Sequence, residues 1–199
     1  MTPRNVRILL AFGAFCAGLV FCIGVVLLVS GRLSAPGGQQ TAAIGGAFRL
    51  TDQDGTTVTD RDFLGRPFLV FFGFTHCPDV CPTTLFEVSE IMRVLGPDAE
   101  RLRAAFITVD PERDTPEVLK DYMSSFDPRL KGLTGDVPAI TAVAKAYRVY
   151  FKKVPLEPDG YAMDHTAIVY LMDKEGRFVS PFSLKRTTDA AVADLRKYL

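Results

Sequence analysis

Two cysteines, Cys77 and Cys81, stand with three residues between them where an apolar run at 67–72 gives way to a helical pattern. The other two cysteines of the chain, Cys16 and Cys22, lie in a hydrophobic N-terminal stretch. We therefore expect Cys77 and Cys81 to be the only thiols of the water-soluble region. Their chemistry is limited to a dithiol–disulfide couple, a soft-metal site or a structural crosslink.

A structural crosslink is the least expected of the three, because a disulfide between Cys77 and Cys81 would close a loop too short to constrain much of the unfolded chain. If the segment is helical, the two side chains share one face, with Cβ atoms roughly 5–6 Å apart. Two thiols placed in this way can form a reversible disulfide or hold one metal ion. A helix N-terminus also favours the thiolate, which predicts a lowered thiol pKa.

The chain has two histidines, His76 and His165. His76 adjoins Cys77, and neighbouring side chains of an extended segment point to opposite sides, so we leave it out of the ligand set. His165 precedes an apolar run at 166–172 that predicts a strand. In a thioredoxin-like fold the loop before this strand faces the dithiol, so His165 is the expected third ligand. Thiolates select Cu(I), thiolate with imidazole also accommodates Cu(II), and zinc accepts the same donors, so the spacing leaves the metal open.

Strand and helix patterns alternate through the C-terminal region. Continuous apolar runs at 67–72 and 104–109 predict strands buried on both faces, and apolar residues at helical spacing follow each run. The strand at 166–172 is followed by a turn at 173–176, a short strand at 177–180 and a last amphipathic helix. This order predicts an α/β fold, a thioredoxin-like mixed sheet flanked by helices. The dithiol then lies at the carboxyl end of a central strand, where open α/β sheets bind ligands.

The N-terminal region has the pattern of a membrane anchor. No charged residue occurs from Ile8 to Gly31, a stretch of 24 positions, and a helix of that length crosses a hydrocarbon core of roughly 30 Å. The residues that follow are rich in Gly and Pro, as in flexible tethers. We therefore expect four segments: a cytoplasmic N-terminus at 1–7, a transmembrane helix at 8–29, a flexible linker at 30–46 and a globular domain at 47–199.

Charge predicts the orientation of the chain and excludes one class of partner. Arg4 and Arg7 precede the apolar stretch and only Arg32 follows it closely, so the positive-inside bias places the domain outside the cytoplasm. The lack of an Arg-rich transit peptide favours a bacterial cytoplasmic membrane, crossed once, with the C-terminal domain facing the periplasm. Lys+Arg and Asp+Glu each number 23, which gives zero formal net charge. Without a basic cluster, we expect no nucleic-acid partner.

Three segments, taken together and in this order, resemble the signature segments of the SCO/SenC family: 72–82, which contains the cysteine pair, 109–116, and 163–166, which contains the histidine. The family consists of membrane-anchored copper proteins with a thioredoxin fold. We interpret the charged residues of 109–116 as turn and capping residues.

By matching positions, the resemblance implies that Cys77, Cys81 and His165 are copper ligands, for Cu(I), Cu(II) or both. It also implies the activity of a metallochaperone, which binds one copper ion and delivers it to the binuclear copper site of cytochrome c oxidase subunit II. Such a protein requires an upstream copper donor as a second partner.

The main alternative is a thiol-disulfide reductase that keeps the cysteines of that copper site reduced, in which Cys77 and Cys81 would be catalytic. A general reductase is disfavoured because the motif is CxxxC and because residues 163–165 stand where thioredoxins place a substrate-binding cis-proline. A peroxiredoxin-type peroxidase is disfavoured because its Pro-x-x-x-Thr-x-x-Cys pattern, ended on Cys77, meets Val70 and Phe74.

Overall fold

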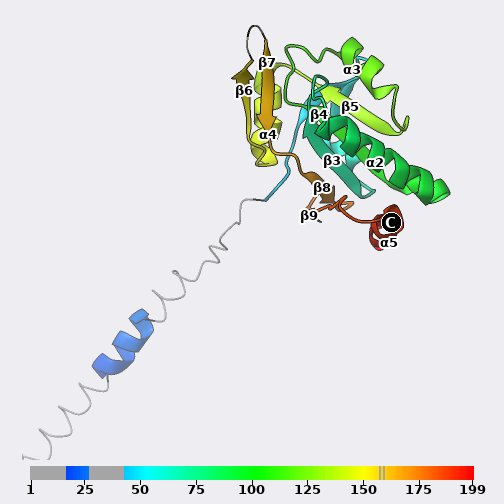
Figure 1. Cartoon of the computed structure of the whole chain (residues 1–199). Coiled ribbons are helices and arrows are strands. Elements are labelled where there is room, and N and C mark those ends of the chain that lie inside the picture. Colours follow the sequence, from blue (N-terminus) through cyan, green and yellow to red (C-terminus); the bar gives the residue numbers. More distant parts are fainter. Residues whose placement is uncertain (1–16, 27–42, 157, 159) are drawn as a thin grey trace, which may run out of the picture. The chain divides into compact units, whose positions relative to one another are not determined.

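The computed structural model describes residues 17–26, 43–156, 158 and 160–199 (Figure 1). Residues Ala43–Leu199 form a compact unit of their own. Its strands and helices, in chain order, are β1 Arg49–Asp52, β2 Thr57–Thr59, η1 Asp60–Phe63, β3 Phe68–Gly73, α2 Val80–Leu95, η2 Gly96–Arg101, β4 Arg103–Thr108, α3 Pro116–Met123, β5 Leu130–Thr134, α4 Val137–Ala146, β6 Phe151–Pro155, β7 Tyr161–His165, β8 Val169–Met172, β9 Phe178–Pro181 and α5 Thr188–Leu195.

The predicted membrane anchor falls mostly outside the described residues. Of the span predicted at 8–29, residues 17–26 are described and are helical. Among the helices of the described ranges, none is long and apolar enough to cross a membrane. The predicted cytoplasmic segment at 1–7, the rest of the predicted span and residues 30–42 of the predicted linker lie outside the described residues.

One sheet of seven strands forms the centre of the compact unit, in the order β2-β1-β5-β4-β3-β8-β9. The central strands β3, β4 and β5 run parallel, whereas β8 pairs antiparallel with β3 and β1 pairs antiparallel with β5. The mixed sheet and the helices that flank it confirm the predicted fold class. Because β3 and β4 are parallel, the segments that follow them both leave the sheet at the same edge.

Every residue of strand β3 is buried. Because successive side chains of a strand point to opposite sides, β3 is buried on both faces of the sheet. On one side Phe71 packs against Phe106, whose ring in turn contacts Tyr122 of α3. On the other side Phe72 packs against Tyr147, the residue that follows α4. Helices therefore cover both faces of the sheet around the strand that leads into the cysteine pair.

Three features of the fold differ from the sequence prediction. The predicted strand at 166–172 begins only at Val169, and β6 and β7 form a separate two-stranded sheet before it. Strand β5 was not predicted either. Both omissions have one cause: β5 contains Lys131 and Gly132, and β6 is mostly exposed, so neither has the apolar alternation of a half-buried strand.

Truncating the core next to β3 should reduce stability strongly. Phe106 is fully buried, and Phe106→Ala should lower the free energy of unfolding by about 3–5 kcal/mol, measured by urea denaturation. Phe86 is 60 % exposed on α2, so Phe86→Ala is the matched control and should change stability by less than about 0.5 kcal/mol. Equal losses in the two variants would contradict this description of the core.

Candidate metal centre

Cys77 and Cys81 follow β3 at the edge of the sheet, but they lie in different local structures. Helix α2 begins at Val80 with Asp79 as its N-cap, so Cys81 is in the first turn and Cys77 precedes the helix. The Cys77 amide donates a hydrogen bond to the carbonyl of Phe74 (3.2 Å), within a turn. The condition for a shared helical face, a helix that contains both Cys77 and Cys81, is therefore not met. A turn, followed by the start of the helix, holds the pair.

His165 is the last residue of β7, and the sheet brings it to the cysteines. Strand β8 begins at Val169, which pairs with Phe71 of β3, so the short connection from His165 to β8 crosses the carboxyl end of β3. The Nε2 atom of His165 lies 3.8 Å from the Sγ atom of Cys81. Two of the three predicted ligands thus face one another although 84 positions separate them in sequence.

The hydrogen bond on the far side of the ring determines which nitrogen of His165 carries the proton. Its Nδ1 atom lies 3.2 Å from the carbonyl oxygen of Thr166. A carbonyl can only accept a hydrogen bond, so Nδ1 is the protonated nitrogen and Nε2 presents its lone pair to Cys81. Burial lowers the pKa of His165 and outweighs the opposing effects of the Thr166 carbonyl and of Asp164. A neutral imidazole with a free Nε2 is the form that binds metals.

The Cys81 thiol is protonated in this environment. Its side chain is fully buried, and burial raises its pKa well above the ordinary value, with smaller contributions from the hydrogen bond and charge of Cys77. The prediction that the thiol pKa is lowered is wrong for Cys81, because burial outweighs the hydrogen bond with the Phe74 backbone, which acts in the lowering direction. Removal of this proton requires a compensating positive charge, such as a metal ion.

Cys77 is partly exposed, and its sulfur accepts a hydrogen bond from the amide of Cys81 at 3.4 Å. Both cysteines are free thiols. Within the part of the chain that the structure describes, no group of three or more Cys, His, Asp or Glu side chains is assembled as a metal site. Cys81 and His165 are in contact through Sγ and Nε2, and Cys77 lies beside them, its sulfur hydrogen-bonded to the backbone amide of Cys81.

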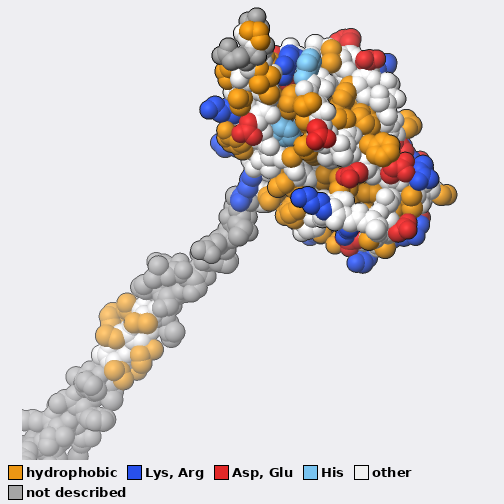
Figure 2. Space-filling view, in the orientation of Figure 1, with side chains coloured by type: hydrophobic (Ala, Val, Ile, Leu, Met, Phe, Trp, Pro, Cys, Tyr) orange, Lys and Arg blue, Asp and Glu red, His pale blue; other side chains and the backbone are white. Residues whose placement is uncertain are grey.

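The donor set fits a soft metal ion. Two sulfur atoms and one imidazole nitrogen suit Cu(I). The rings of Phe71 and Phe74 make T-shaped contacts with the His165 ring, with Phe74 at a centroid distance of 5.8 Å. Other polar side chains nearby have partners elsewhere: His76 is exposed and lies 3.0 Å from the Thr75 hydroxyl. On the face of Figure 2, histidine side chains reach the surface among hydrophobic and acidic side chains.

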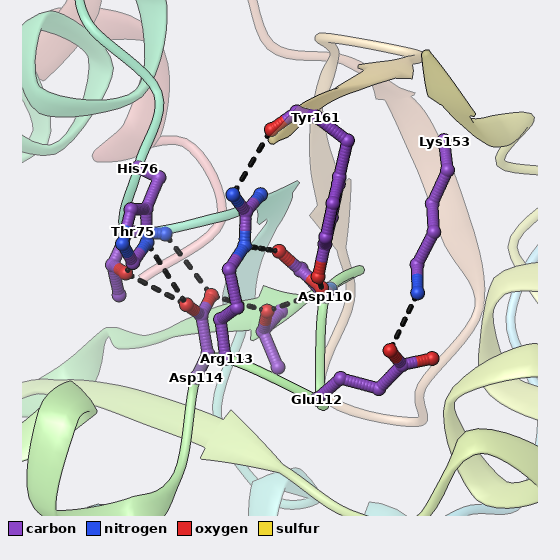
Figure 3. Close-up of polar contacts among 9 residues, drawn as sticks. Thr75, His76, Asp110, Glu112, Arg113, Asp114, Lys153 and Tyr161 are labelled. Carbon is purple, nitrogen blue, oxygen red and sulfur yellow. Dashed lines mark hydrogen bonds and ion pairs between the residues drawn. The ribbon is translucent and has the colours of Figure 1, made fainter. Parts of the chain in front are cut away.

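The turn after β4 contains residues whose role the sequence interpretation underestimated (Figure 3). The buried carboxylate of Asp114 accepts hydrogen bonds from the amide and the hydroxyl of Thr75, two residues before Cys77. Arg113 binds the backbone carbonyl of Tyr161, on the strand that ends in His165. These contacts are more than capping. The only signal in the sequence was the placement of charged residues after a buried strand, and that signal does not name their partners.

The comparison that identifies the family covers most of the chain. The profile of the SCO1/SenC family matches residues 36–199. The chain belongs to the SCO1/SenC family. Membership confirms the resemblance of the three segments, and the matched range includes the cysteine pair and His165.

Individual relatives agree with the profile. The mouse mitochondrial SCO1 homologue is 45% identical over 142 residues, which are 70% of this chain and 50% of that protein. The structure of Bradyrhizobium japonicum ScoI with copper bound has 62% identity and a TM-score of 0.77, covering 79% of this chain and 100% of that one. Arabidopsis thaliana ScoI, also solved with copper bound, has 38% identity and a TM-score of 0.72, covering 78% and 98%. The match spans about half the length of the mitochondrial SCO1 homologues from mouse, Arabidopsis thaliana and human.

Gly73 leaves no room for a side chain beneath the site. A Cβ atom there would lie 2.6 Å from Phe106 and 2.7 Å from the sulfur of Cys81. Gly73→Ala should therefore lower the free energy of unfolding by about 1–3 kcal/mol, measured by urea denaturation. At Gly46 the nearest atom to such a Cβ is 3.4 Å away, so Gly46→Ala is the control and should be close to neutral. Equal stability of the two variants would contradict the close packing beneath Cys81.

The pKa of His165 should lie below the ordinary histidine value of about 6.5 in the metal-free protein, because burial disfavours the imidazolium. As the pH falls through 6.5, the unfolded chain binds more protons than the native protein, so the free energy of unfolding decreases. The loss stops below the folded pKa. NMR titration of the ring protons measures the pKa, and His165→Gln should flatten the stability profile between pH 7.5 and 5.5. A folded pKa at or above that of the urea-unfolded chain would refute this.

Proposed function

We propose that this protein is a copper metallochaperone that holds one copper ion with Cys77, Cys81 and His165. The observation that carries the proposal is the contact of 3.8 Å between the Cys81 sulfur and the His165 Nε2 atom, which presents its lone pair. Two soft sulfur donors and a neutral imidazole form a donor set for Cu(I), and the same set accommodates Cu(II). The copper-bound structures of two relatives support this choice of metal over zinc.

Loading requires both thiols to be reduced and both protons to leave. Cys77 is the more exposed cysteine, so its sulfur is the first contact for an incoming copper ion. Cys81 would keep its proton until the charge of the metal compensates the buried thiolate. The Nε2 atom of His165, 3.8 Å from the Cys81 sulfur, would then complete the set of ligands. Each copper bound therefore releases protons, and oxidation of the pair to a disulfide abolishes binding. Delivery reverses this order as the ligands of an acceptor replace the three one at a time.

Family membership and the N-terminal sequence support a proposal for the acceptor and for the location. We assign the binuclear copper site of cytochrome c oxidase subunit II as the acceptor, with an upstream protein as the copper donor. The uncharged stretch from Ile8 to Gly31 supports a single transmembrane anchor at 8–29 in a bacterial cytoplasmic membrane. The linker at 30–46 would then tether the domain at 47–199 in the periplasm, where the acceptor site is reached from the same side.

A second candidate function is a thiol-disulfide reductase that acts on the cysteines of the acceptor site. One observation favours it: the backbone amide of Cys81 donates to the sulfur of Cys77, and a hydrogen bond of this kind stabilises an attacking thiolate. The buried thiol of Cys81, with its raised pKa, would resolve the mixed disulfide slowly, because the thiolate is the reactive form. This weakness ranks the reductase second.

Removal of the imidazole separates the two functions. His165→Ala should weaken copper retention by more than the roughly 10–100-fold that loss of an outer partner of a ligand costs, and it should leave the rate of disulfide exchange with a model dithiol nearly unchanged. The experiment uses the full chain in detergent, reduced and loaded with Cu(I), and measures retention against a chromogenic chelator.

His76→Ala is the matched control. His76 is the other histidine of the chain and adjoins Cys77, but its ring is hydrogen-bonded to the Thr75 hydroxyl. The variant should retain copper as the unmodified protein does. Unchanged retention in His165→Ala would remove His165 from the site, and a chain that holds no copper yet cycles its disulfide readily would be a reductase.

A further inference from the structure

The hairpin of β6 and β7 lies outside the seven-stranded sheet, yet its last residue is His165. In the register of this hairpin, Phe151 pairs with His165 and Pro155 pairs with Tyr161. Exposed side chains predominate in β6. A two-stranded sheet is marginally stable by itself, so contacts with the rest of the domain must fix the position of the histidine.

Arg113 supplies a large share of those contacts. Its guanidinium stacks on the ring of Tyr161, with the Cζ atom 3.7 Å from the ring centroid. Its Nη1 atom donates to the backbone carbonyl of Tyr161 at 2.9 Å, and its Nε atom donates to the carboxylate of Asp110. The Tyr161 hydroxyl donates to the other oxygen of Asp110 at 2.9 Å, which closes a ring of contacts among the three residues (Figure 3).

Arg113 is also linked to His165 through the ring of Phe74. The Arg113 guanidinium also lies 6.0 Å from the ring centroid of Phe74. Phe74 is buried and packs edge-on against His165, at a centroid distance of 5.8 Å and an interplanar angle of 89°. Arg113 therefore lies between an aromatic ring of the hairpin and the aromatic ring that forms one wall of the histidine position.

The turn that contains Arg113 also contacts the loop before the cysteines, through Asp114. Asp114 follows Arg113 directly and accepts hydrogen bonds from the Thr75 amide (3.0 Å), the Thr75 hydroxyl (2.7 Å) and the Thr108 hydroxyl (2.5 Å). Thr75 belongs to the loop that leads into Cys77. Adjacent residues of one turn thus fix the two halves of the candidate site, the loop before the cysteines and the hairpin before the histidine.

We propose that Arg113 is a positioning residue which, by clamping Tyr161 and Phe74, holds the Nε2 atom of His165 toward Cys81 before a metal arrives. The inference rests on the proposed function, since it assigns Arg113 a part in the same site. Arg113 touches no ligand atom, and it acts through the hairpin. Arginine suits this role because its planar guanidinium can stack on a ring and donate in its own plane at the same time, which an ammonium group cannot do.

The test compares variants of the full chain in detergent. Arg113→Gln removes the charge, and Arg113→Lys keeps the charge but lacks the planar guanidinium. Tyr161→Leu removes the aromatic ring on which the guanidinium stacks. Arg129→Gln is the matched control: Arg129 is similarly half-buried and forms an ion pair with a nearby aspartate, Asp127. It precedes β5, at the amino ends of the parallel strands, whereas Arg113 follows β4 at their carboxyl ends.

The first readout is the tautomer of His165 in the reduced, metal-free protein, measured from the imidazole nitrogens by NMR. The unmodified chain and Arg129→Gln should show the Nδ1-protonated form alone. Arg113→Gln, Arg113→Lys and Tyr161→Leu should show both tautomers in exchange. The second readout is Cu(I) retention against a chelator, which should fall by roughly 10–100-fold in the same three variants and should not change in Arg129→Gln.

The outcomes separate this inference from the function on which it rests. A folded Arg113→Gln with a single tautomer and unchanged copper retention overturns the positioning role and leaves the chaperone proposal intact. Full recovery in Arg113→Lys overturns the stacking argument, because charge alone would then suffice. If the unmodified chain holds no copper, the chaperone proposal fails, and the tautomer readout still decides the role of Arg113. If Arg113→Gln does not fold, Tyr161→Leu gives the same decision.

Discussion

The buried carboxylate of Asp114 constrains the edge of the sheet where the cysteines lie. A charge removed from water must find hydrogen-bond donors inside the protein, and Asp114 finds three, two on Thr75 and one on Thr108. One partner lies at the end of β4 and the other in the loop after β3, so the charge ties together two segments that leave neighbouring parallel strands. The loop that contains Cys77 is thereby tied to β4 through a buried carboxylate, in addition to the hydrogen bonds that Cys77 itself makes with Phe74 and Cys81.

The candidate site combines this rigid polar support with a nonpolar interior. Burial keeps both Cys81 and His165 uncharged in the metal-free protein, and a neutral imidazole and a protonated thiol suit a poorly hydrated position. In the proposed complex, two thiolates with one Cu(I) carry a single net negative charge, whereas the metal-free dithiolate would carry two. In that proposed complex the metal charge would compensate the buried thiolate of Cys81, and departure of the metal would return the site to a neutral, protonated state. This reversibility is what a carrier requires.

The central strands could be predicted from the sequence because they are buried on both faces, and continuous apolar runs such as 67–72 rarely have another explanation. The hairpin of β6 and β7 could not, because its stability comes from the clamp by Arg113 and from pairing with itself, and neither leaves a pattern of alternating apolar residues. The local structure at Cys77 could not be predicted either, for a different reason. Residues four apart share a face only within a helix, but α2 begins at Val80, three residues after Cys77, and spacing alone does not show where a helix begins.

The sequence by itself determined the chemical options: two thiols four positions apart, two histidines, an uncharged N-terminal stretch and three segments typical of one family. Residue types decide which metals and which reactions are available, and they are fully present in the sequence. Only the tertiary structure decided that Cys81 is protonated, that the Nε2 atom of His165 faces it and that Arg113 spans the distance between Tyr161 and Phe74. Each of these depends on which groups are excluded from water and which lie side by side, and the pairing of β8 with β3 creates that proximity between residues far apart in the chain.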